Sequence, residues 1–163
     1  MCNTTEISIS TPYQSGGMGV VLSQTMAPRA ICMGKDTRGL GRQAWTRLRG
    51  KDRAITIISA YLYCKLSTAG VQIVYKQHAM KLPVHQEPQQ QFLVDLEECI
   101  QKHKEQGYMI ILGMELNDPD QRYGITKYFE EMNMKRTIQS IHCGQRPPTT
   151  NILNNSHYPI DGI

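Results

Sequence analysis

The stretch from Tyr108 to Pro119, Tyr-Met-Ile-Ile-Leu-Gly-Met-Glu-Leu-Asn-Asp-Pro, constrains the fold of this chain more than any other. Its first five residues form an apolar run that is typical of a strand buried on both faces. Glu115 and Asn117 follow one residue apart, so both side chains project to the same side if the strand extends this far. Open α/β sheets place their ligands at the carboxyl ends of such strands. The pattern indicates a functional carboxylate and amide, and the alternative is a strand that runs out into a plain polar loop.

The segments that precede this strand predict where it lies in a sheet. Residues 54–61 are rich in isoleucine and predict a strand. Residues 68–81 predict one helix, and residues 88–106 predict a second, with apolar side chains at helical spacing. A strand, a helical crossover and another strand favour two parallel neighbours in one sheet. Tyr61 would then lie beside Glu115 and Asn117.

The rest of the chain completes a mixed α/β domain that spans residues 1–163. Strands are expected at 18–23, 28–33 and 43–48, and with 54–61 they form an antiparallel meander. A weak edge strand is expected at 6–10. After Pro119 the pattern predicts a helix at 124–132, a short strand at 136–141, and the start of a strand in 158–163.

Basic residues gather between Arg29 and Arg53. This segment holds eight lysines and arginines against two aspartates, a local excess of six in a chain whose net charge is +4. Such a cluster is a candidate phosphate-binding surface, and a solvated hairpin with basic outward positions is the alternative. Trp45 lies within it and could stack on a base, although packing in the core is the more common role of a single tryptophan.

The cysteines and the hydropathy pattern point to an intracellular protein of the cytoplasm or nucleus. The five cysteines are widely spaced with no C-x-x-C pair, which indicates reduced thiols in place of a disulfide framework or zinc site. The first residues lack the pattern of a signal peptide, and no apolar run is long enough to span a bilayer. The histidines have no partner at ligand spacing, and His78 and His103 fall on predicted helix faces, where packing is their expected role.

Three separated segments together resemble the endonuclease/exonuclease/phosphatase superfamily, the fold of the deoxyribonuclease I and apurinic-endonuclease type, in its retroelement-associated or eukaryotic-microbe branch. Ile111-Leu112-Gly113-Met114-Glu115-Leu116-Asn117 is similar to the apolar-Gly-Asp-x-Asn strand end of that family. Ser59-Ala60-Tyr61 is similar to its Thr-Ala-Tyr strand end, and Tyr158-Pro159-Ile160-Asp161-Gly162-Ile163 to its Ile-Asp-Tyr-Ile element. Their order and spacing also fit, so the resemblance covers nearly all of this chain and the middle of the family domain.

The resemblance implies a four-layer α/β sandwich, in which two packed mixed sheets are covered by outer helices, here truncated at both ends. It implies hydrolysis of phosphodiester or phosphomonoester bonds with a divalent cation, usually Mg²⁺. The implied catalytic residues are Tyr61, as a donor to the phosphate or leaving group, Glu115, which orients the attacking water, Asn117, which binds a phosphate oxygen, and Asp161, which orients a histidine. Lys35, Arg38, Arg42 and Thr149 are the implied substrate-binding residues.

The chain departs from the family pattern at three places. No residue corresponds to the glutamate that holds the metal, and none to the catalytic histidine, so the metal site is expected to be incomplete. Glu115 stands where the family has aspartate, which displaces the carboxylate by about one C–C bond, and a shift of ~1 Å can cost roughly a hundredfold in rate. We therefore expect the isolated chain to show no magnesium-dependent cleavage above background.

Two other functions stay open beside a hydrolase that acts on nucleic acid or another phosphate ester. The first is a non-catalytic remnant of the same fold that binds nucleic acid through Lys35, Arg38 and Arg42. The second is an unrelated nucleotide-binding α/β module, against which the absence of a G-x-G-x-x-G or Walker-type loop argues. The fold does not identify the substrate, because one fold supports many functions. The sequence also gives no indication of the oligomeric state.

Overall fold

The computed structural model describes residues 2–3, 17–63, 78–79, 81–116, 124–141 and 161–162. The chain divides into two compact units, Met1–Gly113 and Met114–Ile163. Several predictions fall outside the described residues: the strand at 6–10, most of the helix at 68–81, and the site residues Asn117 and Thr149. Of that helix, the structure describes 78–79 and 81, and all three residues are helical.

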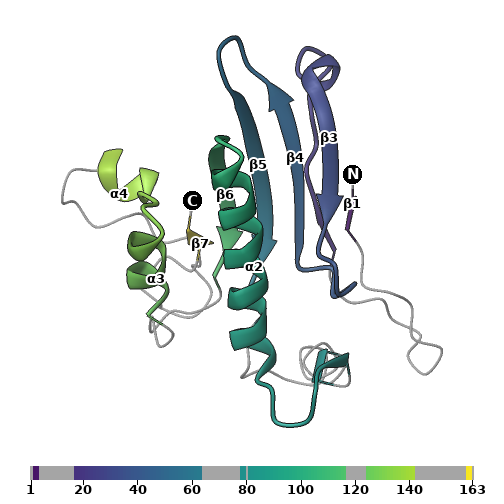
Figure 1. The fold of residues 1–163 in the computed structure, drawn as a ribbon, viewed down its shortest axis with the longest axis vertical. Helices are drawn as coiled ribbons and strands as arrows, with labels where there is room; N and C mark the ends of the chain where they lie inside the picture. Colours follow the sequence, from purple (N-terminus) through teal and green to yellow (C-terminus); the bar gives the residue numbers. More distant parts are fainter. Residues whose placement is uncertain are drawn as a thin grey trace, which may run out of the picture. The chain divides into compact units, whose positions relative to one another are not determined.

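A mixed sheet forms the centre of the first unit (Figure 1). Its strands lie in the order β3 (Ala30–Lys35), β4 (Gln43–Arg49), β5 (Ala54–Tyr61) and β6 (Met109–Glu115). β3, β4 and β5 pair antiparallel, which confirms three strands of the predicted meander. The fourth strand, expected at 18–23, is not a member of this sheet. β6 runs alongside β5 in the same direction, so the two strands are the predicted parallel neighbours (Figure 1).

The observed strand boundaries agree best where the apolar pattern is strongest. β5 begins and ends at the predicted residues, and β4 is one residue longer than predicted. The predicted strand 18–23 is reduced to β2, Met18–Gly19. A short 3-10 helix, η1 (Ala27–Arg29), occupies the start of the predicted strand 28–33 and moves β3 two residues later, because Pro28 suits the first turn of a helix and cannot donate to a strand ladder.

The helix α2 (Pro88–Glu105) covers one face of this sheet (Figure 1). Its buried stripe includes Leu96 and Ile100, both fully buried, as its periodicity predicts. Pro88 lies in the first turn, where its missing N–H costs no helical hydrogen bond. Gly107 has a φ of 77° and its N–H donates to the Lys104 carbonyl at 2.8 Å, so the helix ends where predicted.

Polar and aromatic groups fix α2 to the sheet near the carboxyl end of the helix. Arg47 of β4 donates to the Tyr108 hydroxyl at 3.1 Å and to Gln106 Oε1 at 2.9 Å, and its Nη2 lies 3.1 Å from His103 Nδ1. The Trp45 ring meets the His103 ring edge-on at 4.6 Å between centroids. Trp45 and His103 are therefore packing residues, as was expected of both.

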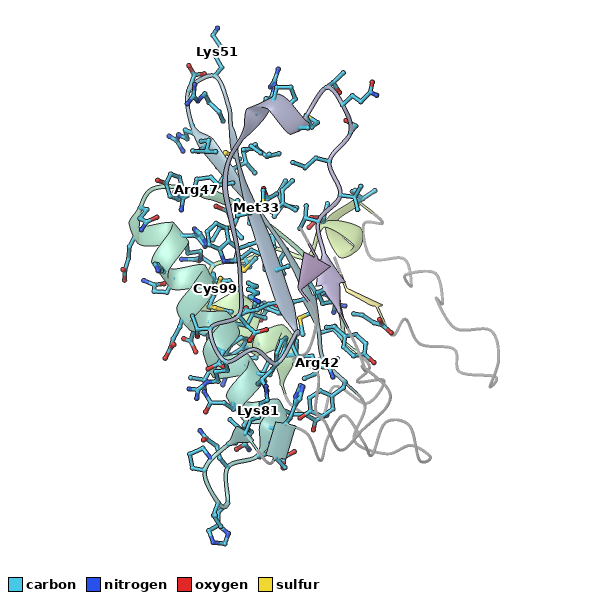
Figure 2. All side chains as sticks on the ribbon, turned by 90° about the vertical axis from the view of Figure 1, so that its right-hand side faces the viewer. Met33, Arg42, Arg47, Lys51, Lys81 and Cys99 are labelled. Atoms are coloured by element: carbon cyan, nitrogen blue, oxygen red, sulfur yellow. The ribbon has the colours of Figure 1, made fainter. Side chains whose placement is uncertain are left out.

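The opposite face of the sheet lies against a smaller sheet made of β1 (Cys2–Asn3) and β2. These two strands pair antiparallel, and β2 contacts β4 and β5. Figure 2 shows this pair on the side of the main sheet away from α2. Burial alternates along β3: Met33 is 52% exposed, and the residues directly before and after it are half-buried.

The second unit contains the end of β6 and three further short elements. Met114 and Glu115 pair antiparallel with β7 (Asp161–Gly162), which confirms a strand within 158–163. α3 (Ile125–Glu131) lies within the predicted helix 124–132. The predicted strand at 136–141 is wrong, because residues Thr137–Ile141 form the helix α4. The Ser140 N–H and hydroxyl both donate to the Arg136 carbonyl, so local hydrogen bonds override the weak β-propensity of this segment.

Candidate functional site

Tyr61 closes β5 and is half-buried. Its backbone N–H donates to the Arg42 carbonyl at 2.9 Å, which extends the pairing of β4 and β5 by one step. The Cζ atom of Arg42 lies 5.2 Å from the centroid of the Tyr61 ring, within the range of a cation–π interaction. The predicted catalytic phenol and a predicted substrate-binding arginine therefore lie next to each other.

Arg42 is the most deeply buried charged residue at this end of the sheet, with 2% of its surface exposed. Its Nε donates to His78 Nε2 at 3.1 Å, and its Cζ lies 5.4 Å from the centroid of the Tyr63 ring. Nη1 and Nη2 are also buried, and neither has a hydrogen-bond partner among the residues that the structure describes. Burial lowers the pKa of Arg42, and the neighbouring tyrosines and Asp36 oppose that shift. The guanidinium thus retains unused donors for an anionic group.

His78 accepts the Arg42 hydrogen bond and is therefore neutral at Nε2. Burial, and then the charge of Arg42, lower the pKa of His78 to about 4. The Tyr63 ring meets the His78 ring edge-on at 5.0 Å between centroids. Protonation of His78 at Nε2 would place two positive groups in contact, so this pair requires the neutral imidazole.

The backbone around Arg42 is held by Asp36 in the loop that joins β3 and β4. Asp36 is buried, and its two carboxylate oxygens accept the N–H groups of Leu40 at 2.8 Å and Arg42 at 3.2 Å. Gly39 and Gly41 both have a φ of 69°, a left-handed conformation that favours glycine and lets the loop close around the carboxylate. Arg42 is thus placed by its main chain as well as by its side chain.

The other two predicted substrate-binding residues in this unit lie on the surface. Lys35 ends β3 and is exposed. Arg38 is exposed as well, and its Nε donates to both carboxylate oxygens of Asp95 on α2, at 3.0 and 2.9 Å. Arg38 therefore has an intramolecular partner, whereas two donors of the buried Arg42 have none within the part of the chain that the structure describes.

Glu115 and Asp161 are brought together in the second unit. They are Cα partners in the antiparallel pair of β6 and β7, and Glu115 is exposed. Asn117 and Thr149 lie outside the described residues. Whether Tyr61 of the first unit reaches the Glu115 carboxylate stays a prediction.

Among the described ranges, no group of three histidine, cysteine, aspartate or glutamate side chains is placed to hold a metal ion. Magnesium binds through oxygen ligands and retains several waters. A magnesium site in this chain stays a prediction.

Sequence reasoning missed two residues of the Arg42 cluster. Asp36 received no role, although an aspartate that begins a glycine-containing loop is a recognisable signal for side-chain bonds to the backbone. His78 was expected to be packed, which is correct, but its contact with Arg42 joins residues 36 positions apart and has no local signal.

Comparisons with protein-family models, with curated proteins and with solved structures found no match to this chain. Within the described residues, no helix is both long and apolar enough to cross a membrane.

Proposed function

We propose that this chain is part of a magnesium-dependent phosphodiester hydrolase of the endonuclease type, with nucleic acid or another phosphate ester as substrate. The observation that supports the proposal most lies in the first unit, where β5 and β6 are neighbouring strands and Tyr61 ends β5 beside Arg42. Parallel neighbours bring their carboxyl ends to one edge of a sheet, which is the usual ligand position in α/β folds.

The proposed roles follow the needs of attack on phosphorus. Such a reaction requires an oriented water, neutralised phosphate oxygens and a stabilised leaving oxygen. Glu115 orients the water, Asn117 donates to a phosphate oxygen, and Tyr61 donates to the phosphate or to the leaving group. Asp161 orients an imidazole, as carboxylates commonly do. Magnesium would supply positive charge at the phosphate, and its place in the proposal rests on the family resemblance alone.

Arg42 gives independent support for an anion at this end of the first unit. A buried guanidinium is costly when two of its donors have lost water, and among the described residues Nη1 and Nη2 of Arg42 have no partner. A phosphate oxygen would satisfy them in the bidentate geometry that arginine favours. Lys35, Arg38 and Thr149 remain proposed substrate contacts. To bind a phosphate, the Arg38 guanidinium must also keep or break its hydrogen bonds to Asp95.

The proposed fold is the four-layer sandwich. α2, the main sheet and the β1–β2 pair lie in three successive layers, as expected for such a fold. Met33 is exposed on the face away from α2, which suits a surface that a larger second sheet would cover. The cytoplasm or nucleus remains the proposed location.

Calorimetric titration with dithymidine monophosphate, a single phosphodiester, tests the proposed site with and without Mg²⁺. We expect saturable binding that Mg²⁺ strengthens. In Glu115→Gln the binding in Mg²⁺ should be about tenfold weaker, a loss of about 1.4 kcal/mol, because a carboxylate favours an anionic phosphate only through the cation between them. Glu130→Gln is the matched control, because Glu130 is exposed on α3 of the same unit. Equal affinity in Glu115→Gln and in the unmodified chain would contradict the proposal.

A non-catalytic nucleic-acid-binding remnant is the second candidate, since the family resemblance leaves the metal-binding glutamate without a counterpart in this sequence. A plasmid-nicking assay with Mg²⁺ is expected to give no product with this chain under either candidate. Product that is lost in Glu115→Ala would support the hydrolase and contradict the expectation that the site is incomplete. Steeply salt-dependent binding that neither Mg²⁺ nor Glu115→Gln changes supports the remnant.

A further inference from the structure

The hairpin that joins β4 and β5 carries an exposed group of basic side chains at its tip. Arg49 is the last residue of β4, and Lys51 and Arg53 lie in the turn that leads to β5. Ala30 is the Cα partner of Leu48, so Arg29 lies at the same end of the sheet. Figure 2 shows Lys51 at the end of the molecule far from Arg42 and Lys81. We call Arg29, Arg49, Lys51 and Arg53 the basic end.

The basic end is distinct from the other basic residues between 29 and 53. Arg38 is bound to Asp95, Arg47 is bound to Tyr108 and Gln106, and Arg42 is buried. By contrast, all four side chains of the basic end are exposed, and none has a hydrogen bond or ion pair within the part of the chain that the structure describes. Asp52 is the single acidic residue in the turn.

The tip is held in a defined conformation. The strand pairing extends to the Cα partners Arg49 and Ala54, directly beside the turn. A Cβ at Gly50 would collide with the Arg53 carbonyl oxygen, so the backbone closes tightly at this point. Because the turn is already ordered, a ligand that binds here has less backbone entropy to remove than one that binds a loose loop.

We propose that the basic end binds the phosphate backbone of a nucleic acid at a place separate from Tyr61. Three of its four residues are arginines, whose planar guanidinium groups match phosphate oxygens. Residues 49–53 include no apolar side chain that could enter the hydrocarbon of a membrane, which favours a nucleic acid over a lipid surface.

The distance along β5 sets a minimum length for a nucleic acid that reaches both places. β5 has eight residues, and at ~3.3 Å per residue Tyr61 lies about 25 Å from the turn. About eight base pairs span that length, at ~3.4 Å per step. The inference does not depend on hydrolysis, because it concerns binding without a metal.

Fluorescence anisotropy with a labelled 20-base-pair duplex in EDTA, from 50 to 200 mM salt, tests the inference. The triple variant Arg49→Gln/Lys51→Gln/Arg53→Gln is expected to bind at least tenfold more weakly at 50 mM salt. The slope of log affinity against log salt should become less steep by about three, since each phosphate contact contributes ~0.9. The single variant Lys51→Gln should change the slope by about one, and circular dichroism checks that both variants are folded.

The matched control removes two exposed lysines elsewhere, Lys127→Gln/Lys135→Gln, and is compared with the double tip variant Lys51→Gln/Arg53→Gln, which changes the net charge equally. It should keep the slope of the unmodified chain. An equal loss in the control and the tip variant would overturn the proposal, because binding would then follow net charge alone. Tip-dependent binding to vesicles with 30% phosphatidylserine that is as tight as duplex binding would also overturn it in favour of a lipid surface.

Discussion

Arg42 directly precedes β4 and Arg47 lies within it, and the two residues differ in how their donors are used. Arg47 donates to the Tyr108 hydroxyl and to Gln106, while Nη1 and Nη2 of Arg42 are buried without a partner among the described residues. A buried charge without a partner opposes folding, whereas a well-bonded one is costly to remove. The two arginines should therefore respond in opposite ways to the same substitution.

Urea unfolding of Arg42→Met and Arg47→Met measures this difference. We expect Arg42→Met to be neutral or to raise the free energy of unfolding by about 1–2 kcal/mol, because methionine keeps the apolar volume and removes the desolvated charge. Arg47→Met should lower it by about 2 kcal/mol or more, since Tyr108 and Gln106 lose a charged donor. A loss in Arg42→Met as large as that in Arg47→Met would show that the Arg42 guanidinium is satisfied.

His78 should make the stability of the first unit depend on pH. Its pKa in the folded protein is about 4, below the ordinary value of 6.5, so the unfolded chain takes up this proton first. The free energy of unfolding is then greatest above pH 6.5 and falls as the pH decreases toward 4. At ~1.4 kcal/mol per pH unit for one proton, the loss is about 3 kcal/mol.

His78→Gln separates this proton from the other groups that titrate in the same range. Burial and the charge of Arg47 also lower the pKa of His103, which adds a contribution of the same sign. Removal of His78 should therefore reduce the slope of unfolding free energy against pH by about one proton between pH 6.5 and 4, and leave the His103 contribution. An unchanged slope in His78→Gln would contradict the assignment.

At the scale of elements, the β4–β5 hairpin depends on a glycine that has no room for a side chain. The hypothetical Cβ of Gly50 collides with a backbone oxygen, which cannot move without opening the turn. We expect Gly50→Ala to lower the free energy of unfolding by about 1–3 kcal/mol, in the range of other backbone strain. Gly113→Ala in β6 is the control, because an added Cβ there meets nothing within 4 Å, and it should be neutral or slightly stabilising.

Elements with a long apolar pattern could be predicted from the sequence, and short ones could not. β5 and α2 each bury a continuous face, which fixes both their type and their bounds. The segment 136–141 has too few residues for a period to be recognised, and it forms α4 where a strand was expected. β-propensity alone depends on context, so a run without a partner strand is weak evidence for a strand.

The candidate site could be predicted as residue types at strand ends, but not as a set of contacts. The position of Tyr61 next to a basic residue follows from the order of the strands. The inward position of Arg42 does not, because a basic residue within a basic segment resembles its exposed neighbours. Asp36 and His78 hold Arg42 from distant positions in the sequence, and one sequence carries no signal for such pairs.

At the scale of the whole molecule, charge is divided between two ends of the sheet in the first unit. The Tyr61 end holds the buried Arg42 guanidinium, whose Nη1 and Nη2 have no partner among the described residues, and the opposite end holds the exposed basic end. If both ends bind phosphates, one nucleic acid would contact the basic end and extend along the sheet to Tyr61. Shortening a duplex below about eight base pairs should then weaken binding sharply.

A double-mutant cycle on the binding of dithymidine monophosphate in Mg²⁺ tests most directly whether Tyr61 and Glu115 act on one phosphate. The four proteins are the unmodified chain, Tyr61→Phe, Glu115→Gln and the double variant, each titrated by calorimetry. We predict that the two losses in binding free energy are coupled by about 1 kcal/mol, because both groups act through the same ligand. Losses that add to within about 0.3 kcal/mol would place the phenol and the carboxylate in separate sites and contradict the proposed hydrolase.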